Sequence, residues 1–248
     1  MSAAVLRAAG VSKRFGDVVA LDGVSLEVAA GECVALVGES GSGKSTLLRV
    51  FNGLTTLDGG EAFVGGQAVA SVDPVPLRRG IGYVPQDGGL LPHWTVAENA
   101  ALVPRLTGRA DAQALASAAL DLVGLRVPEF GPRWPHQLSG GQRQRVAFAR
   151  AIAGGAPVVL LDEPFGALDA ITRSDLQAMF LALRARTGMA ALLVTHDLHE
   201  AARLADRIAV IRGGRIEQTS TPAVLMGAPA TPYVADLLVR ARLTGARA

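Results

Sequence analysis

A glycine-rich octapeptide at residues 38–45 is the feature that most constrains how this chain folds. It reads GESGSGKS, it matches the pattern G-x-x-x-x-G-K-[ST], and it lies between the apolar run Cys33 to Val37 and a helical pattern over Thr46 to Asn52. Strand, loop and helix in that order are the context in which this pattern forms a phosphate-binding loop. The alternative is a Gly/Ser turn before a helix, but a random chain of this length contains the pattern with a probability on the order of 1%.

The loop supplies specific groups to a bound phosphate chain. Glycines let successive backbone N–H groups point at phosphate oxygens, and the start of the following helix adds the positive end of its dipole. We expect Lys44 to reach the β- and γ-phosphates, and Ser45 to offer its hydroxyl to Mg²⁺, a hard cation that prefers oxygen ligands. The predicted ATP-binding residues of this loop are Gly38, Glu39, Ser40, Gly41, Ser42, Gly43, Lys44, Ser45 and Thr46.

Three short apolar runs predict a buried, largely parallel sheet in an α/β fold. They are CVALVG at 33–38, VVLLDE at 158–163 and AALLVTH at 190–196, and amphipathic segments separate them. Runs that are apolar on both faces are typical of parallel strands covered by helices. Each run ends in polar residues, and ligands of α/β folds bind at the carboxyl ends of the strands.

The rest of the chain predicts two additions to this core within one domain over residues 1–248. Residues 5–30 favour an antiparallel layer with turns at 15–17 and 21–23, and glycine pairs at 59–60 and 65–66 bracket another short strand. From about 89 to 155 strand signals fade, and residues 110–123 and 143–152 indicate helices. We therefore predict a core of about 1–88 and 156–248 with an inserted α-helical lobe.

Two carboxylates follow the second apolar run directly. Asp162 fits the role of holding Mg²⁺ through its water shell, and Glu163 fits the role of the base that polarises an attacking water. A pair of acids that cap a helix is an equally good interpretation of these two residues alone.

Two further side chains occupy comparable positions. His196 follows the third apolar run and is a candidate to contact the γ-phosphate, although a lone histidine at a strand end is more often structural. Gln86 ends a short strand in the segment Tyr83 to Gln86. Its amide is a candidate to touch Mg²⁺ or the attacking water where the helical lobe begins.

Composition excludes several classes of function. The longest uncharged run, Thr219 to Ala235, contains three prolines, so no segment predicts a membrane-spanning helix. Residues 1–10 lack a secretory signal, and we expect the chain to stay in the cytosol. The net charge of +2 makes no electrostatic case for nucleic-acid binding. The single cysteine, Cys33, lies in an apolar run and is expected to be a buried small residue.

A second predicted anion site lies at residues 138–142. The segment Leu138-Ser139-Gly140-Gly141-Gln142 precedes a helical pattern, so it presents backbone N–H groups and a hydroxyl at a helix start. At average residue frequencies this pentapeptide occurs about once per million positions.

The chain resembles the ATP-binding-cassette (ABC) ATPases over nearly its whole length. The motifs that carry the resemblance are, in order, GESGSGKST, YVPQ, LSGGQRQRVAFARA, VVLLDEP, GALD and VTHD. The resemblance implies a P-loop NTPase (RecA-like) core, hydrolysis of ATP with Mg²⁺, and a head-to-tail dimer with two ATP molecules at its interface. It also implies that residues 138–142, Ser139 and Gly141 above all, serve the partner's nucleotide, and that Asp169 lines the dimer contact. Phe15 falls where the family usually has an aromatic ring stacked on adenine; the alternative is an ordinary core aromatic.

The resemblance further implies separate membrane permeases as partners. A single cassette without a membrane segment is similar to importer subunits that lie on the inner face of the membrane and dock through residues 87–98, with a substrate-binding protein as an indirect partner. Trp94 is either an anchor in that segment or part of the lobe's core. The stretches LLPHWTVAENAALVP and FGALDAITRSDLQ resemble importers of osmoprotectants such as glycine betaine, choline or carnitine. The alternatives are another small solute or an exporter; a P-loop kinase or GTPase, or an ABC protein of DNA repair, fits less well.

Overall fold

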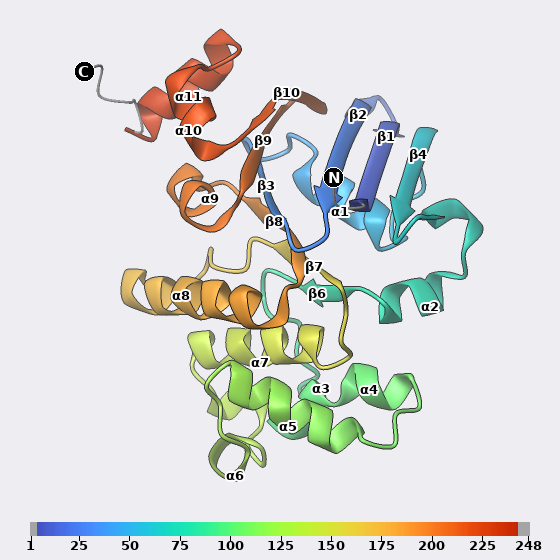
Figure 1. Cartoon of the computed structure of the whole chain (residues 1–248), viewed down its shortest axis with the longest axis vertical. Helices are drawn as coiled ribbons and strands as arrows, with labels where there is room; N and C mark the ends of the chain where they lie inside the picture. Colours follow the sequence, from blue (N-terminus) through green and yellow to red (C-terminus); the bar gives the residue numbers. More distant parts are fainter. Residues whose placement is uncertain (1–3, 243–248) are drawn as a thin grey trace. The chain divides into compact units, whose positions relative to one another are not determined.

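The computed structural model describes residues 4–242, which belong to two compact units (Figure 1). Unit 1 combines residues up to 74 with those from 190 onward, and unit 2 comprises residues 75–189. The single domain with a lobe at about 89–155 stays a prediction.

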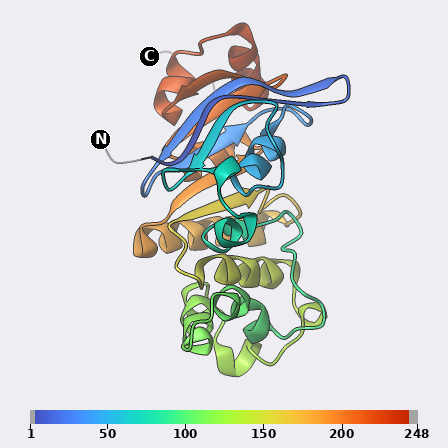
Figure 2. The same ribbon diagram turned by 90° about the vertical axis from the view of Figure 1, so that its right-hand side faces the viewer.

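An antiparallel sheet opens unit 1. Its strands are β1 (Ala4–Phe15), β2 (Val18–Ala29), β4 (Gly59–Val64) and β5 (Gln67–Ala68), in the order β2-β1-β4-β5. Alternate residues of β2, including Val24, Leu26 and Val28, are buried, as expected for a sheet with one covered face. The predicted antiparallel layer is confirmed, and Figure 2 shows the β1–β2 hairpin as a long projecting ribbon.

The turn predicted at residues 21–23 is wrong. These residues lie inside β2, and the register between β1 and β2 shifts on both sides of Val11, which pairs with Val24. Gly23 has a φ of 64° and its N–H donates to Ser12 Oγ at 3.0 Å. The glycine therefore absorbs a β-bulge rather than a chain reversal, and a local sequence pattern does not separate the two.

The strands that carry the phosphate loop lie in the same unit. The strand β3 (Cys33–Val37) runs parallel to both β8 (Ala190–Thr195) and β9 (Arg207–Arg212), while β10 (Arg215–Ser220) is antiparallel to β9. Every residue of β3 and β8 is buried, so two of the predicted core strands are confirmed and Cys33 is buried as expected. The helices of this unit are α1 (Lys44–Phe51), α9 (Leu198–Leu204), α10 (Pro222–Gly227) and α11 (Pro232–Arg240), with a 3₁₀ turn at Val69–Ser71.

Unit 2 is mainly helical. The parallel pair β6 (Gly82–Val84) and β7 (Val158–Asp162) accompanies a set of helices, and β7 confirms the third predicted core strand. The helices of this set are α2 (Pro74–Arg79), α3 (Val96–Ala100), α4 (Leu102–Leu106), α5 (Ala112–Leu122), α6 (Val127–Phe130), the 3₁₀ turn Pro135–Gln137, α7 (Gly140–Ile152) and α8 (Ala170–Thr187). The helices predicted at 110–123 and 143–152 correspond to α5 and α7 and are confirmed.

Three aromatic rings form the centre of unit 2. Phe148 of α7, Phe165 after β7 and Phe180 of α8 are fully buried, and their ring centroids lie 5.9–6.2 Å apart. Such spacing favours offset or edge-on contact between aromatic rings. The cluster fixes α7 and α8 relative to the end of β7, where the two predicted carboxylates follow.

None of the helices within residues 4–242 combines the length and apolar character that a bilayer crossing requires.

Candidate functional site

Glycine is required at two positions of the loop between β3 and α1, because backbone carbonyl groups of neighbouring strands lie too close for a Cβ. A Cβ on Gly38 would lie 2.1 Å from the Ile211 carbonyl oxygen of β9, and one on Gly43 would lie 2.3 Å from the Ala20 carbonyl oxygen of β2. Gly43 also has a φ of 107°, a region that side chains other than glycine rarely adopt. The loop is therefore pressed between two strands, and its path does not depend on its own sequence alone.

Lys44 spans the concave side of this loop. Its side chain is only 5% exposed, and its Nζ donates to the carbonyl oxygens of Gly38 at 2.8 Å and Glu39 at 2.7 Å. Burying an ammonium group is costly unless it is paired and hydrogen-bonded, so these bonds hold the cation at the loop. A phosphate oxygen bound at the loop forms a stronger hydrogen bond with the Lys44 ammonium group than either carbonyl does, because the phosphate oxygen carries a negative charge.

The polar groups of the loop fit a bound polyanion. The Ser42 side chain is 6% exposed, and its Oγ has no hydrogen-bond partner within residues 4–242. An unsatisfied buried hydroxyl costs free energy, which a ligand oxygen at the loop removes. Together with Lys44 and the start of α1, the loop offers a set of donors and a positive dipole end.

The same residues fit Mg²⁺ as part of a nucleotide complex. The half-buried Ser45 lies in the first turn of α1, next to Lys44. Within residues 4–242 no group of three or more His, Cys, Asp or Glu side chains is placed to hold a metal. Such a cage is not needed, because Mg²⁺ is commonly held by one or two protein oxygens together with substrate phosphates and water.

Two further predicted residues lie in unit 1. Phe15 ends β1 at the β1–β2 turn and is 53% exposed, with Lys13 Nζ 5.4 Å from its ring centroid. The alternative of an ordinary core aromatic is therefore wrong, and an exposed ring is available for stacking. His196 follows β8 directly and is exposed, so it lies at a strand's carboxyl end as predicted.

The predicted carboxylates of unit 2 lie at the carboxyl end of β7. Asp162 is the last residue of the strand and is 8% exposed, while Glu163 follows with a φ of 47°. A positive φ at a residue other than glycine is uncommon, and such strain concentrates at functional sites. The helix-capping alternative is not what the structure shows, since the next helix, α8, is capped by Asp169.

Gln86 lies in a turn that α7 holds in place. It is exposed and follows β6, and the Gly88 N–H donates to the Pro85 carbonyl oxygen at 3.0 Å. The Arg150 guanidinium donates to the carbonyl oxygens of Gly88 at 2.8 Å and Gly89 at 2.6 Å. Burial lowers the pKa of Arg150, and the nearby Asp87 carboxylate opposes that shift. A largely buried cation on α7 thus fixes the backbone just after Gln86.

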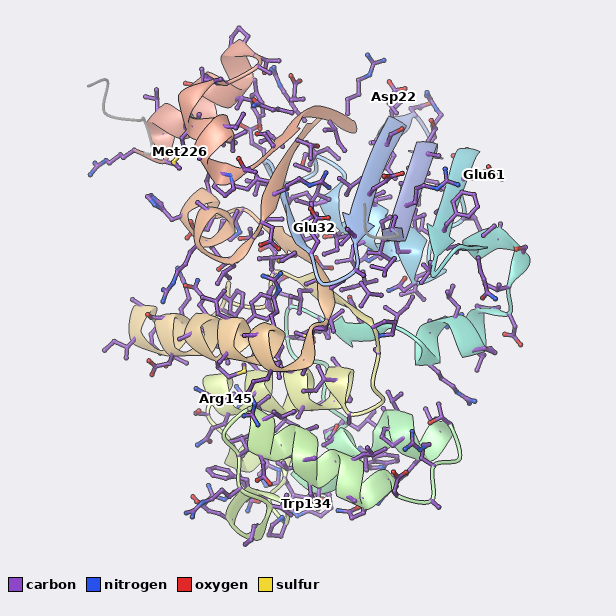
Figure 3. The ribbon with its side chains drawn as sticks, in the orientation of Figure 1. Asp22, Glu32, Glu61, Trp134, Arg145 and Met226 are labelled. Carbon is purple, nitrogen blue, oxygen red and sulfur yellow. The ribbon has the colours of Figure 1, made fainter. Side chains whose placement is uncertain are left out.

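We expect Arg150→Ala to loosen this turn and to lower the free energy of unfolding by about 2–3 kcal/mol, because two carbonyl groups lose a charged donor. Chemical unfolding measures the stability, and hydrogen exchange over residues 85–92 measures the local loosening. Arg145→Ala is the matched control, because this residue lies on the same helix (Figure 3). Its guanidinium donates instead to the Val123 carbonyl oxygen at 2.6 Å. Faster exchange at 85–92 in both variants would contradict the assigned role of Arg150.

The predicted second anion site is a well-formed helix start. Ser139 is the N-cap of α7, its Oγ accepts from the Gln142 N–H at 3.2 Å, and the Gln142 side chain accepts from the Ser139 N–H at 2.9 Å. This capping box occupies the Gln142 N–H, so by helical geometry Gly140 and Gly141 are the residues whose N–H groups remain to meet an anion. Leu138 is buried and anchors the segment.

Gly141 and Asp169 have structural roles that the sequence did not indicate. A Cβ on Gly141 would lie 2.4 Å from Thr172 Cγ2, so a larger residue there displaces the first turn of α8. Asp169 caps that helix by accepting from the N–H groups of Ile171 and Thr172, and the hydrogen bonds with Thr172 are the main reason why its pKa is lowered. Its predicted place at a dimer contact stays a prediction.

Sequence reasoning missed Arg150. The signal was present, because this arginine lies in the apolar run Phe148 to Ile152 of a predicted helix, and a charge on a buried face indicates a polar partner. What the sequence did not contain was the identity of that partner, which lies 61 and 62 residues earlier.

Comparisons with known proteins identify the family and the fold class of this chain. The family model described as ABC transporter matches residues 21–166, more than half of the chain. The chain therefore belongs to the ABC transporter family. It is similar to the dimeric post-hydrolysis structure of the ATP-binding cassette MJ0796 bound to ADP and Pi, with 33% identity and a TM-score of 0.78 over 88% of this chain and 98% of that one. The predicted fold class, a P-loop NTPase core with an antiparallel layer and helices, is confirmed.

The curated relatives act on different cargoes. The chain is 42% identical over 236 residues to the choline transport ATP-binding protein OpuBA of Bacillus subtilis, covering 94% of this chain and 62% of that protein. It is 47% identical over 232 residues to the sulfate/thiosulfate import ATP-binding protein CysA of Mycobacterium bovis, covering 93% of this chain and 65% of that protein. This chain thus spans less than two thirds of the length of either relative.

Proposed function

We propose that this chain binds and hydrolyses ATP with Mg²⁺ and powers a transporter. The observation that carries the proposal is the loop at residues 38–45, where Lys44 is buried across the concavity and the buried Ser42 hydroxyl lacks a partner within residues 4–242. An ammonium group and a hydroxyl at one loop are groups that bind a triphosphate well. The exposed Phe15 ring offers a stacking surface for the adenine.

Mg²⁺ is assigned to Ser45, Asp162 and Gln86 in this proposal. A hydroxyl, a carboxylate and an amide oxygen are ligands that this hard cation accepts, directly or through water. The chemistry that the cation supplies when bound is neutralisation of charge on the phosphate oxygens. The buried position of Asp162 keeps its carboxylate in one orientation.

The attack of water on the γ-phosphate is assigned to Glu163, His196 and Gln86. Glu163 accepts a proton from the water, and its uncommon backbone conformation at the end of β7 is typical of functional sites. His196 contacts the γ-phosphate from the end of β8, and the Gln86 amide orients the water. Assembly of these residues of units 1 and 2 around one nucleotide is part of the proposal.

Residues 138–142 are proposed to act in trans in a head-to-tail dimer. The Ser139 hydroxyl and the Gly140 and Gly141 N–H groups form a helix start that suits the γ-phosphate held by a second copy. The dimeric state of MJ0796 supports this arrangement by analogy. ATP binding to the closed dimer, followed by hydrolysis, supplies the motion that moves the permeases.

The transport role rests on the relatives. We propose that the chain lies on the cytoplasmic face of the membrane, docks permease subunits through residues 87–98 and works with a substrate-binding protein to import a small solute. A quaternary-amine osmoprotectant is the first candidate, because the relative OpuBA is named a choline transport ATP-binding protein. Sulfate, from CysA, and spermidine or putrescine, from the PotA protein of Nitrosomonas europaea, are competing cargoes.

A phosphate-release assay on the purified chain tests the ATPase part of this proposal. We expect turnover with Mg-ATP and none when the cation is chelated.

Ser139→Glu is expected to keep ATP binding but to prevent ATP-dependent dimerisation, because a carboxylate then faces the partner's γ-phosphate. Dimers of this variant formed with ATP, as seen by light scattering, would remove residues 138–142 from the trans role.

A further inference from the structure

Glu39 connects the phosphate loop to the helix α11. Its carbonyl oxygen accepts a hydrogen bond from Lys44 Nζ at 2.7 Å, so its backbone position determines where the ammonium group lies. Its carboxylate forms an ion pair with Arg240 of α11 at 3.7 Å, and Arg240 also pairs with Asp236 at 2.7 Å. Glu39 therefore contacts Lys44 through its backbone carbonyl and α11 through its side chain.

Tyr233, at the start of α11, connects this helix to the end of β9. The Arg212 guanidinium lies 4.6 Å from the centroid of its ring, a cation–π distance. Its hydroxyl oxygen is buried and makes no hydrogen bond of standard geometry with a described residue. Burial raises the pKa of Tyr233, and the Glu39 carboxylate raises it further.

The strand β9 and the turn that follows it contact two neighbouring parts of the loop. The Ile211 carbonyl of β9 packs against Gly38, as described above, and the Gly214 N–H donates to the Ser42 carbonyl oxygen at 3.1 Å. The Gly214 carbonyl in turn accepts from the N–H of Asp22 in β2 at 2.9 Å. Contacts from residues 211–240 thus reach Gly38, Glu39 and Ser42.

We propose that α11 positions the phosphate loop through Glu39, and that Tyr233 and Arg240 are positioning residues that set the affinity for ATP without touching it. The proposal rests on the proposed function, in that ATP is the ligand of the loop. Nothing in the assigned ATPase chemistry requires residues 211–240, so this role is separate from the catalytic ones.

The helix α11 affects the affinity for ATP in two ways, through the charge of Arg240 and through the restriction that Tyr233 places on the conformations of the loop. The Glu39 carboxylate repels a triphosphate bound to the same loop, and Arg240 neutralises that charge. Because both side chains are more than half exposed, the ion pair itself adds little to stability and weakens as salt is added. Tyr233 limits the conformations that the loop adopts before ATP binds, so less entropy is lost on binding.

Equilibrium binding of Mg-ATP and steady-state hydrolysis test the proposal in the full chain. We expect Arg240→Gln to raise the Kd for ATP about threefold at low ionic strength, with the difference shrinking at high salt. Tyr233→Ala is expected to raise it about tenfold. The kcat of both variants stays within about twofold of wild type, because bound ATP meets the same catalytic residues.

Matched variants separate positioning from general damage. The exposed Arg242→Gln removes the same charge two residues further on and should leave the Kd unchanged. Tyr233→Phe keeps the ring on Arg212 and should restore most of the affinity that Tyr233→Ala loses. In a Glu39→Gln background Arg240→Gln should have no effect, since the charge that it neutralises is gone.

Wild-type Kd values in both Arg240→Gln and Tyr233→Ala would overturn the proposal, and so would a loss of kcat at constant Kd. A lowered Tm with normal affinity in the folded fraction would also overturn it. Failure of the proposed function itself looks different: wild type would then bind no ATP. If Tyr233→Ala does not fold, Arg240→Gln and its combination with Glu39→Gln still test whether α11 positions the loop, because Arg240 is exposed.

Discussion

Glu163→Gln should lower the rate of ATP hydrolysis by at least about 100-fold while ATP still binds, because the amide no longer accepts a proton from the attacking water. Glu163 follows a fully buried strand and has a φ of 47°, so its backbone lies at the carboxyl end of β7 in an uncommon conformation. The substitution changes the charge and keeps the shape. The variant should therefore accumulate the ATP-bound dimer, which light scattering detects as an ATP-dependent change in mass.

The control for this variant is Glu61→Gln, which makes the same chemical change at an exposed glutamate of β4 in unit 1. That variant should hydrolyse ATP at the wild-type rate. Normal turnover by Glu163→Gln would remove this residue from the base role. Bound ATP without a change in mass would mean that dimer closure requires the permeases or that residues 138–142 do not act in trans.

Much of this fold follows from patterns that are local in sequence. The three core strands are continuous apolar runs because they are buried on both faces, and such runs leave a clear signal at β3, β7 and β8. The loop at 38–45 is equally local, since its glycines, lysine and serine lie within eight residues. The positions of Asp162, which ends β7, and His196, which follows β8, were predicted for the same reason, while their roles stay predictions.

The parts that were missed depend on contacts between distant residues. Gly23 has the composition of a turn, but pairing with β1 turns it into a bulge. The close approach of Ile211 to Gly38, the bonds from Arg150 to Gly88 and Gly89, and the pair between Arg240 and Glu39 all join residues more than 60 positions apart. Periodicity and propensity carry no information on which distant groups meet.

Lys44→Met should remove most ATP binding, with a rise in Kd of about 30-fold or more. The substitution deletes the ammonium group that the loop holds over its concavity and keeps an unbranched apolar stem of similar length, so packing around the buried side chain is largely retained. Losing one partner of a buried charged contact costs about 2–5 kcal/mol of binding free energy, which corresponds to that change in Kd.

Calorimetric titration with Mg-ATP measures the effect of Lys44→Met, and thermal unfolding without nucleotide shows whether the fold survives. Lys44→Arg is the informative companion, because it restores the charge but replaces a compact ammonium by a planar fork that does not fit two carbonyl groups of one tight loop. We expect it to bind ATP better than Lys44→Met and less well than wild type. An unchanged Kd in a folded Lys44→Met protein would mean that the triphosphate does not lie in the concavity of residues 38–45, and the roles assigned to Ser45, Asp162 and Glu163 would fail with it.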